Sequence, residues 1–187
     1  MGMGAAIRKA WNGVSTVLVV LAVLLAILLG GVRLIGLQPY VVLSGSMEPT
    51  YPVGSLIYVK QTDSRQIQPG QAMTFLLDEN LVATHRVVER VPDPEDPETI
   101  RYRTKGDANE TEDGGLVHYK NVIGIPVFHI PYLGYLANFI QNPPGTYVTI
   151  ALGAALLLVI FLPDLLFPEK TSDKKRKAAG QTEPPQI

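Results

Sequence analysis

Two long apolar runs lie near the ends of the chain, and a region of short apolar runs lies between them. From Trp11 to Val32 there is no charged residue, and about 20 apolar residues in a helix cross roughly 30 Å of hydrocarbon. We therefore predict a transmembrane anchor over residues 14–37. A cleaved signal peptide is the alternative, but this run is longer than the usual core of about 7–15 residues and lacks a good small-residue cleavage site.

The second long apolar run covers residues 146–167 and reads TYVTIALGAALLLVIFLPDLLF. Its uninterrupted part, Tyr147 to Leu162, is shorter than the first run, and Pro163 and Asp164 interrupt its end. A buried core helix is one interpretation of such a run. A basic stretch follows it, however, which is typical of a segment that leaves a membrane on the cytoplasmic side. We predict a second transmembrane helix here.

The region between these runs, residues 38–145, has the pattern of a β-rich domain. Short runs of β-branched and aromatic residues alternate with turn residues, and the acidic, proline-rich segment Pro92–Glu98 predicts a loop. Pro131–Ile140 is apolar enough to lie at a membrane surface. The fold class is therefore mainly β, a wrapped sheet with an N-terminal and a C-terminal transmembrane helix. The predicted strands are Ser55–Lys60, Ala72–Leu77, Leu81–Val91, Thr99–Lys105 and Val122–Phe128.

Charge divides the chain in the same places. The formal net charge is only -1, but residues 1–32 and 168–187 each carry +2 and the middle carries -5. Because basic flanks stay in the cytoplasm, residues 1–13 and the basic tail 168–187 are predicted to be cytoplasmic and residues 38–145 extracytoplasmic. The near-neutral balance does not favour nucleic acid as a partner. The absence of cysteine excludes disulfides, thiolate zinc sites and a cysteine nucleophile.

A turn of small residues, Ser44-Gly45-Ser46-Met47-Glu48-Pro49-Thr50, is the first candidate for chemistry. Such a turn can present a hydroxyl and aim a backbone N–H at the same point, although Ser-Gly-Ser turns are also common in linkers. A serine hydroxyl needs a base to become a nucleophile at neutral pH. The candidate bases are His85 in a predicted strand, His118, and His129 near the predicted membrane surface, each of which could instead be an ordinary structural histidine.

A polar loop after a predicted strand supplies the carboxylates. Its glycines, in Lys105-Gly106-Asp107 and in Asp113-Gly114-Gly115, allow a close approach to a site. An acidic surface turn is the alternative, and calcium is a minor one, because the spacing is not that of an EF-hand loop. The ligands in that calcium alternative would be Asp107, Asn109, Glu112 and Asp113. Our prediction is that the protein has no metal and no cofactor.

Taken in order, these segments resemble type I signal peptidases. The resemblance rests on Ser-Gly-Ser-Met-Glu-Pro-Thr, on the His-Arg-Val-Val of a strand, and on Thr-Lys-Gly-Asp-Ala-Asn followed by an Asp, and it covers about residues 14–136. The bacterial branch has a lysine base where this chain has His85. The chain is therefore similar to the archaeal and endoplasmic-reticulum branch, which also occurs in some Gram-positive bacteria.

The resemblance implies a role for each site residue. Ser46 would be the nucleophile, His85 the general base and Asp113 the third triad member, with Asp107 as a supporting acid, although the roles of the two acids could be exchanged. Ser44 would help to bind the oxyanion together with the Ser46 backbone N–H. The chain departs from the family at Gly70-Gln71, where the family commonly has Gly-Asp. The aspartate that the family has there is not catalytic.

The implied function is a membrane-bound serine endopeptidase that removes signal peptides from secreted preproteins after small residues at -1 and -3. Its partners would be signal peptides and the lipid bilayer of the cell membrane, with the translocation machinery as a further candidate. The alternative is a non-enzymatic, membrane-anchored β-domain that serves as a subunit of an assembly or secretion complex. A third hypothesis, Ser–Lys chemistry with Lys105, would leave His85 unexplained.

Overall fold

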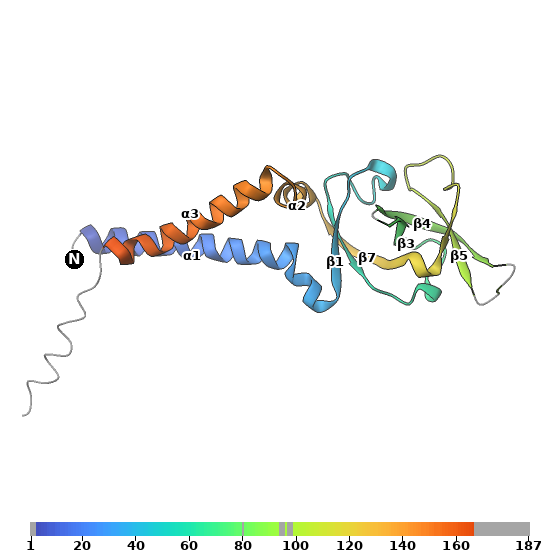
Figure 1. Cartoon of the computed structure of the whole chain (residues 1–187), viewed down its shortest axis with the longest axis horizontal. Helices are drawn as coiled ribbons and strands as arrows, with labels where there is room; N and C mark the ends of the chain where they lie inside the picture. Colours follow the sequence, from blue (N-terminus) through green and yellow to red (C-terminus); the bar gives the residue numbers. More distant parts are fainter. Residues whose placement is uncertain (1–2, 80, 94–95, 97–98, 167–187) are drawn as a thin grey trace, which may run out of the picture. The chain divides into compact units, whose positions relative to one another are not determined.

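The computed structural model describes residues 3–79, 81–93, 96 and 99–166. The chain divides into two compact units, one formed by Leu18–Thr146 and the other by Met1–Val17 with Tyr147–Ile187. All strands belong to the first unit (Figure 1). The predicted basic tail and four of the seven residues of the predicted Pro92–Glu98 loop lie outside the described residues.

Helix α1, Met3–Leu29, contains residues 14–29 of the predicted anchor. Its segment Lys9–Leu29 is long and apolar enough to cross a membrane, and none of its most apolar stretch is buried inside the protein. The helix ends earlier than the predicted limit of residue 37. Gly30 and Gly31 follow Leu29, and glycine is a poor helix former. The short 3-10 helix η1, Gly31–Ile35, then leads into the first strand.

One antiparallel sheet of seven strands makes up the core of the first unit, so the predicted mainly β fold is confirmed. All five predicted strands are present, with ends shifted by up to two residues. β1 and β6 were not predicted: β1 contains Pro39, which a strand tolerates at a sheet edge, and β6 has only three residues. The order is β1-β2-β7-β3-β4-β5-β6. The strands are β1 Leu37–Val41, β2 Leu56–Lys60, β3 Ala72–Asp78, β4 Leu81–Pro92, β5 Ile100–Lys105, β6 Leu116–His118 and β7 Val122–Ile130.

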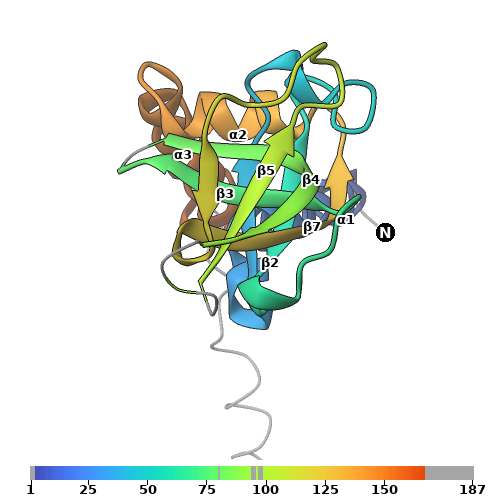
Figure 2. The ribbon, with the colours of Figure 1, turned by 90° about the vertical axis from the view of Figure 1, so that its right-hand side faces the viewer.

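The sheet is strongly coiled, and β2 crosses behind β3 and β4 at a steep angle in Figure 2. Register shifts occur in the β2–β7, β3–β4, β3–β7 and β4–β5 pairs, and such irregularities increase local twist. Two apolar clusters pack against the sheet. One contains Ile67, Met73, Phe75, Val87, Tyr102 and Val117, and the other contains Val32, Leu56, Tyr58 and Ala137.

The segment predicted to lie at the membrane surface forms helix α2, Leu133–Gln141. A Cβ on its Gly134 would lie 2.3 Å from the Ser55 carbonyl oxygen, so the helix packs closely on the β2 end. Tyr135, Leu136 and Phe139 of α2 remain exposed, although the Tyr135 ring also lies against Gly54. Helix α3, Gly145–Leu166, follows and continues through Pro163. Its segment Gly145–Phe161 is apolar, but it is long enough to cross a membrane only when it is combined with α2.

Candidate active site

The Ser46 turn forms a short 3-10 helix, η2, Gly45–Met47. It is fixed at both ends by backbone hydrogen bonds. Before it, the Val42 N–H donates to the Ser55 carbonyl and continues the β1–β2 ladder; after it, the Tyr51 N–H donates to the Met47 carbonyl. The Met47 side chain is only 2% exposed. The turn therefore holds Ser46 on a rigid support rather than on a mobile linker.

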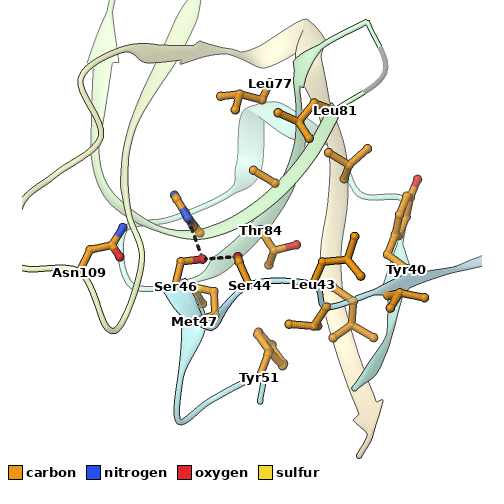
Figure 3. A pocket seen from close by; sticks show the side chains of 16 residues that line it. Tyr40, Leu43, Ser44, Ser46, Met47, Tyr51, Leu77, Leu81, Thr84 and Asn109 are labelled. Atoms are coloured by element: carbon orange, nitrogen blue, oxygen red, sulfur yellow. Dashed lines mark hydrogen bonds between the residues drawn. The ribbon is translucent and has the colours of Figure 1, made fainter. Parts of the chain in front are cut away.

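His85 lies in the first half of β4, directly opposite Met73 of β3. Its Nε2 is 3.2 Å from the Ser46 Oγ, and a dashed line in Figure 3 marks this contact. The ring packs edge-on against Phe75 at a centroid distance of 6.3 Å, and the side chain is 16% exposed. The histidine is thus largely shielded from water, and one ring nitrogen faces the hydroxyl.

The register of β4 with β5 places the acidic loop beside His85. Lys105, the last residue of β5, pairs with Arg86, so the chain that follows starts beside His85. The loop then folds back onto β5, where the Asp113 N–H donates a 2.9 Å hydrogen bond to the Thr104 carbonyl. The Asp113 Oδ2 then lies 2.6 Å from the His85 Nδ1.

Gly106 is required where this loop meets the serine turn. A Cβ on Gly106 would lie 2.6 Å from the Ser46 carbonyl oxygen, closer than real side chains come. That same carbonyl accepts a 2.9 Å hydrogen bond from the Ala108 N–H. At this point the backbones of the two segments touch directly, which fixes the distance between the serine turn and the acidic loop.

The hydrogen-bond network assigns the protons. An ionised carboxylate only accepts, so the His85 Nδ1 carries a hydrogen that it donates to Asp113. In the neutral ring the Nε2 then has a free lone pair and accepts from the Ser46 hydroxyl. The Ser44 hydroxyl, 3.4 Å from the Ser46 Oγ, is left as the donor in that weaker contact. This arrangement can remove a proton from Ser46 and hold the resulting imidazolium next to a carboxylate.

Asp107 contacts Arg86 rather than His85. The Arg86 Nε and Nη2 donate to its two oxygens at 2.7 and 2.6 Å, and the Thr50 hydroxyl donates to Oδ2 at 2.5 Å. The Arg86 Nη1 also donates to the Gly70 carbonyl at 2.7 Å. This Arg86–Asp107 pair ties β4, the acidic loop and the end of the serine turn together. The structure thus brings one carboxylate to the histidine and the other to the arginine.

The Arg86–Asp107 pair has a predictable pH dependence. Hydrogen bonding to Arg86 lowers the pKa of Asp107 despite the opposing effect of burial, and the Thr50 hydroxyl adds to the lowering. A lowered pKa means that the carboxylate stabilises the fold above the pKa of an unfolded Asp, about 3.9, and that this stability is lost as the pH falls through the lower folded value. Asp107→Asn should therefore lower the free energy of unfolding by about 1.5 kcal/mol at neutral pH, since Arg86 is partly solvated.

Unfolding of the full chain in detergent, followed by circular dichroism between pH 3 and 7, measures this effect. The difference between wild type and Asp107→Asn should shrink below about pH 4. Glu110→Gln, which changes an exposed carboxylate of the same loop, is the control. A difference that grows toward low pH would contradict the assignment.

A cavity of about 410 Å³ opens beside Ser46 and His85 (Figure 3). Residues 40–44, at the end of β1 and just beyond it, form one wall, and Leu77 with the Leu81–His85 half of β4 forms the other. Both walls are extended segments with an open edge. β1 is the last strand of the sheet, and the pairing of β4 with β5 begins only at Arg86. The cavity therefore has room for an extended, mostly apolar peptide.

The other two histidines occupy structural positions. The His118 Nδ1 accepts from the Lys120 N–H and caps the 3-10 helix η4, Tyr119–Asn121. His129 lies in β7, edge-on to Tyr51. Lys105 lies at the end of β5, and it is His85 that contacts Ser46. No group of three or more His, Asp or Glu side chains in the described part of the chain could hold a metal ion.

Sequence reasoning missed the residues that support the site. Thr104 contacts Asp113, and Arg86 and Thr50 contact Asp107. All three lie inside or beside the quoted motifs, since Arg86 follows His85, Thr104 precedes Lys105, and Thr50 ends the serine segment. Their partners, however, are 9 to 57 residues away in the chain. Identifying these pairs requires the β4–β5 register, the return of the acidic loop to Thr104 and its contact with the serine turn.

Comparison with known proteins gives a family match over most of the chain. The sequence model of the family described as "Signal peptidase, peptidase S26" matches residues 14–132. Signal peptidase I W of Bacillus subtilis (strain 168) is 43% identical over 82 residues, which cover 43% of this chain and 42% of that protein. The signal peptidase complex catalytic subunit SEC11C of Rattus norvegicus is 30% identical over 128 residues, 64% of this chain and 66% of that protein.

A fungal relative matches over a similar region. The signal peptidase complex catalytic subunit SEC11 of Fusarium vanettenii is 31% identical over 129 residues, 64% of this chain and 73% of that protein. The chain thus covers less than two thirds of the length of the Bacillus and rat proteins. The matched residues 14–132 include both the serine turn and the acidic loop.

Proposed function

This chain belongs to the signal peptidase family, peptidase S26, and from that premise we propose that it is a membrane-bound serine endopeptidase that removes N-terminal signal peptides from preproteins. One observation carries the proposal: the Ser46 Oγ, the His85 ring and the Asp113 carboxylate form a continuous hydrogen-bonded series at 3.2 and 2.6 Å. A non-enzymatic membrane-anchored subunit has no need of such a series, so that alternative is not favoured.

The proposed mechanism follows from the proton assignment. Ser46 attacks the peptide carbonyl while the His85 Nε2 takes its proton, and Asp113 keeps the ring oriented and stabilises the imidazolium. The oxyanion that forms is bound by the Ser46 backbone N–H and the Ser44 hydroxyl. His85 then protonates the leaving amine. In the second half, His85 activates water to hydrolyse the acyl-enzyme.

The cavity beside Ser46 supports a mode of substrate binding. An extended peptide between residues 40–44 and the free edge of Leu81–His85 would add a strand to the sheet, with backbone hydrogen bonds for affinity. Apolar walls suit the end of a signal peptide. From the family resemblance we propose small side chains at the -1 and -3 positions.

Ser44 offers a graded test of the oxyanion assignment. Its hydroxyl lies close to Ser46 on the cavity side, and one oxyanion donor contributes roughly 2.7–4 kcal/mol in other enzymes. Ser44→Ala should therefore lower kcat about 10²–10³-fold, and Ser44→Thr should retain part of the activity. Steady-state cleavage of a preprotein measures this. Unchanged turnover in Ser44→Ala would mean that backbone donors alone bind the oxyanion.

The test of the proposed function is cleavage of a purified preprotein by the full chain in detergent. Mass spectrometry of the products should locate a single cut at the end of the signal peptide. The cut should be absent when Ser46 is alanine. A chain that leaves every tested preprotein intact while remaining folded would favour the subunit alternative.

We further propose that both termini are cytoplasmic, that α1 and α3 both cross the cell membrane, and that the strands lie outside the cytoplasm. Arg8 and Lys9 before the first span, and the basic residues between 170 and 177, support this orientation. The exposed Tyr135, Leu136 and Phe139 of α2 suit the membrane surface, since aromatic side chains favour the lipid–water boundary. In this orientation the site meets signal peptides after translocation.

Protease treatment of intact cells tests this topology. We expect a tag after Ile187 to be protected and a tag between Pro92 and Glu98 to be digested. Permeabilised cells, in which both tags should be lost, are the control. Digestion of the C-terminal tag from outside would mean a single span formed by α1, and it would leave the catalytic assignment intact.

A further inference from the structure

Thr104 is a buried residue that touches the candidate site and has no role in the mechanism above. It lies in β5, opposite Val87 of β4, and is 0% exposed. Its hydroxyl donates to the Asp113 Oδ2 at 2.6 Å. This oxygen is the same atom that accepts from the His85 Nδ1. Two donors therefore meet on one carboxylate oxygen, the Thr104 hydroxyl from β5 and the His85 Nδ1 from β4.

The backbone of Thr104 also holds Asp113, because the Asp113 N–H donates to the Thr104 carbonyl at 2.9 Å. A carboxylate that is 25% exposed on a glycine-rich loop could otherwise rotate toward water. The Thr104 hydroxyl opposes that rotation from a rigid strand. It fixes which oxygen faces His85 and from which direction.

We infer that Thr104 is a positioning residue of the catalytic array, whose buried hydroxyl holds the Asp113 carboxylate against the His85 Nδ1. This inference rests on the proposed function for its effect on turnover. The contact itself does not, since the orientation of Asp113 and the His85 proton can be observed without any substrate.

Two substitutions distinguish a positioning role of Thr104 from a packing role, because each removes a different group of its side chain. Thr104→Val keeps the shape and removes the hydroxyl, whereas Thr104→Ser keeps the hydroxyl and removes the methyl group. If the hydroxyl positions Asp113, Thr104→Val should lower kcat about 10–100-fold, as loss of the outer hydrogen-bond partners of metal ligands does in metalloenzymes, with KM little changed. Thr104→Ser should stay within a few-fold of wild type.

Tyr102→Phe is the matched control. Tyr102 is also fully buried in β5, and its hydroxyl donates to the Ser64 carbonyl rather than to Asp113. Tyr102→Phe removes a comparable buried hydrogen bond and should leave kcat near the wild-type value. Thermal unfolding of each variant in detergent shows that it is folded. Thr104→Ala serves as a second variant if Thr104→Val does not fold, and it should lose kcat to the same extent.

Proton NMR of the full chain in micelles supplies a readout independent of turnover. The His85 Nδ1 hydrogen, in a short bond to a carboxylate, should give a far-downfield resonance that His85→Ala removes. We expect Thr104→Val to shift or broaden it and Thr104→Ser to preserve it. If wild type cleaves no preprotein, the proposed function fails while this measurement still tests the contact. An unchanged resonance and kcat in Thr104→Val, or equal damage in Thr104→Ser, would overturn the inference.

Discussion

Ser46→Ala and His85→Ala should each abolish measurable signal-peptide cleavage. The Ser46 Oγ supplies the attacking atom, and the His85 Nε2 at 3.2 Å is the nitrogen placed to accept its proton. Loss of either partner in such an array typically lowers kcat by on the order of 10⁴-fold or more. Substrate binding should change little, because the cavity walls are formed mainly by other residues.

Single-turnover cleavage of a labelled preprotein by the full chain in detergent measures these losses. The double variant Ser46→Ala/His85→Ala should be no worse than either single variant, because the two residues act in the same step. Ser64→Ala in the 3-10 helix η3, Ser64–Gln66, and His118→Ala at the cap of η4 are matched controls. Near-native turnover in His85→Ala would show that another group is the base.

His85→Lys should be inactive, although lysine is the base in the bacterial branch. A lysine acts as a base only when a dry, apolar pocket favours its neutral form. Here the Asp113 carboxylate faces position 85 at 2.6 Å and would favour the ammonium. Substantial turnover in His85→Lys would mean that the site tolerates either base and that Asp113 is not decisive.

The strands were predictable from local signals, whereas the triad residues were predicted only from the resemblance of their motifs to a known family. Leu81–Val91 and Thr99–Lys105 are runs rich in β-branched residues between turn residues. The Ser46 turn and the acidic loop each had an ordinary structural alternative until the motifs were taken together. β1 was missed because Pro39 weakens a strand pattern, and only its position at the sheet edge makes proline acceptable. The segment after Pro131 was predicted from its apolar composition alone, which does not distinguish a helix from an extended chain.

Which acid contacts His85 and which contacts Arg86 could not be predicted, because these contacts depend on how segments distant in the sequence pair in the fold. Asp107 and Asp113 are both acids of one loop, and sequence spacing leaves their roles exchangeable. The pairing of Arg86 with Lys105 places Asp107 at the guanidinium, and the return of the chain to Thr104 places Asp113 at the imidazole. The sequence leaves the roles of the two acids open, whereas these contacts predict different effects for their removal.

Asp113→Ala should therefore be far more damaging than Asp107→Ala. Removing Asp113 takes away the acceptor that fixes the His85 tautomer and stabilises the imidazolium, and loss of the triad acid costs roughly 3 × 10⁴-fold in kcat in a comparable array. Asp107 hydrogen-bonds to Arg86 and Thr50 rather than to His85, so its removal should cost about 10–100-fold, the range for the outer hydrogen-bond partners of metal ligands.

The two variants form a matched pair, since each removes one carboxylate from the same loop. Cleavage rates measured under single-turnover conditions, with folding checked by circular dichroism, should separate them by at least about two orders of magnitude. Arg86→Lys gives a further check, because lysine cannot make the two-pronged contact with Asp107, and its loss should match that of Asp107→Ala. If Asp107→Ala were the more damaging change in a folded protein, Asp107 would be the acid that serves His85 during turnover, and the loop would have to rearrange when substrate binds.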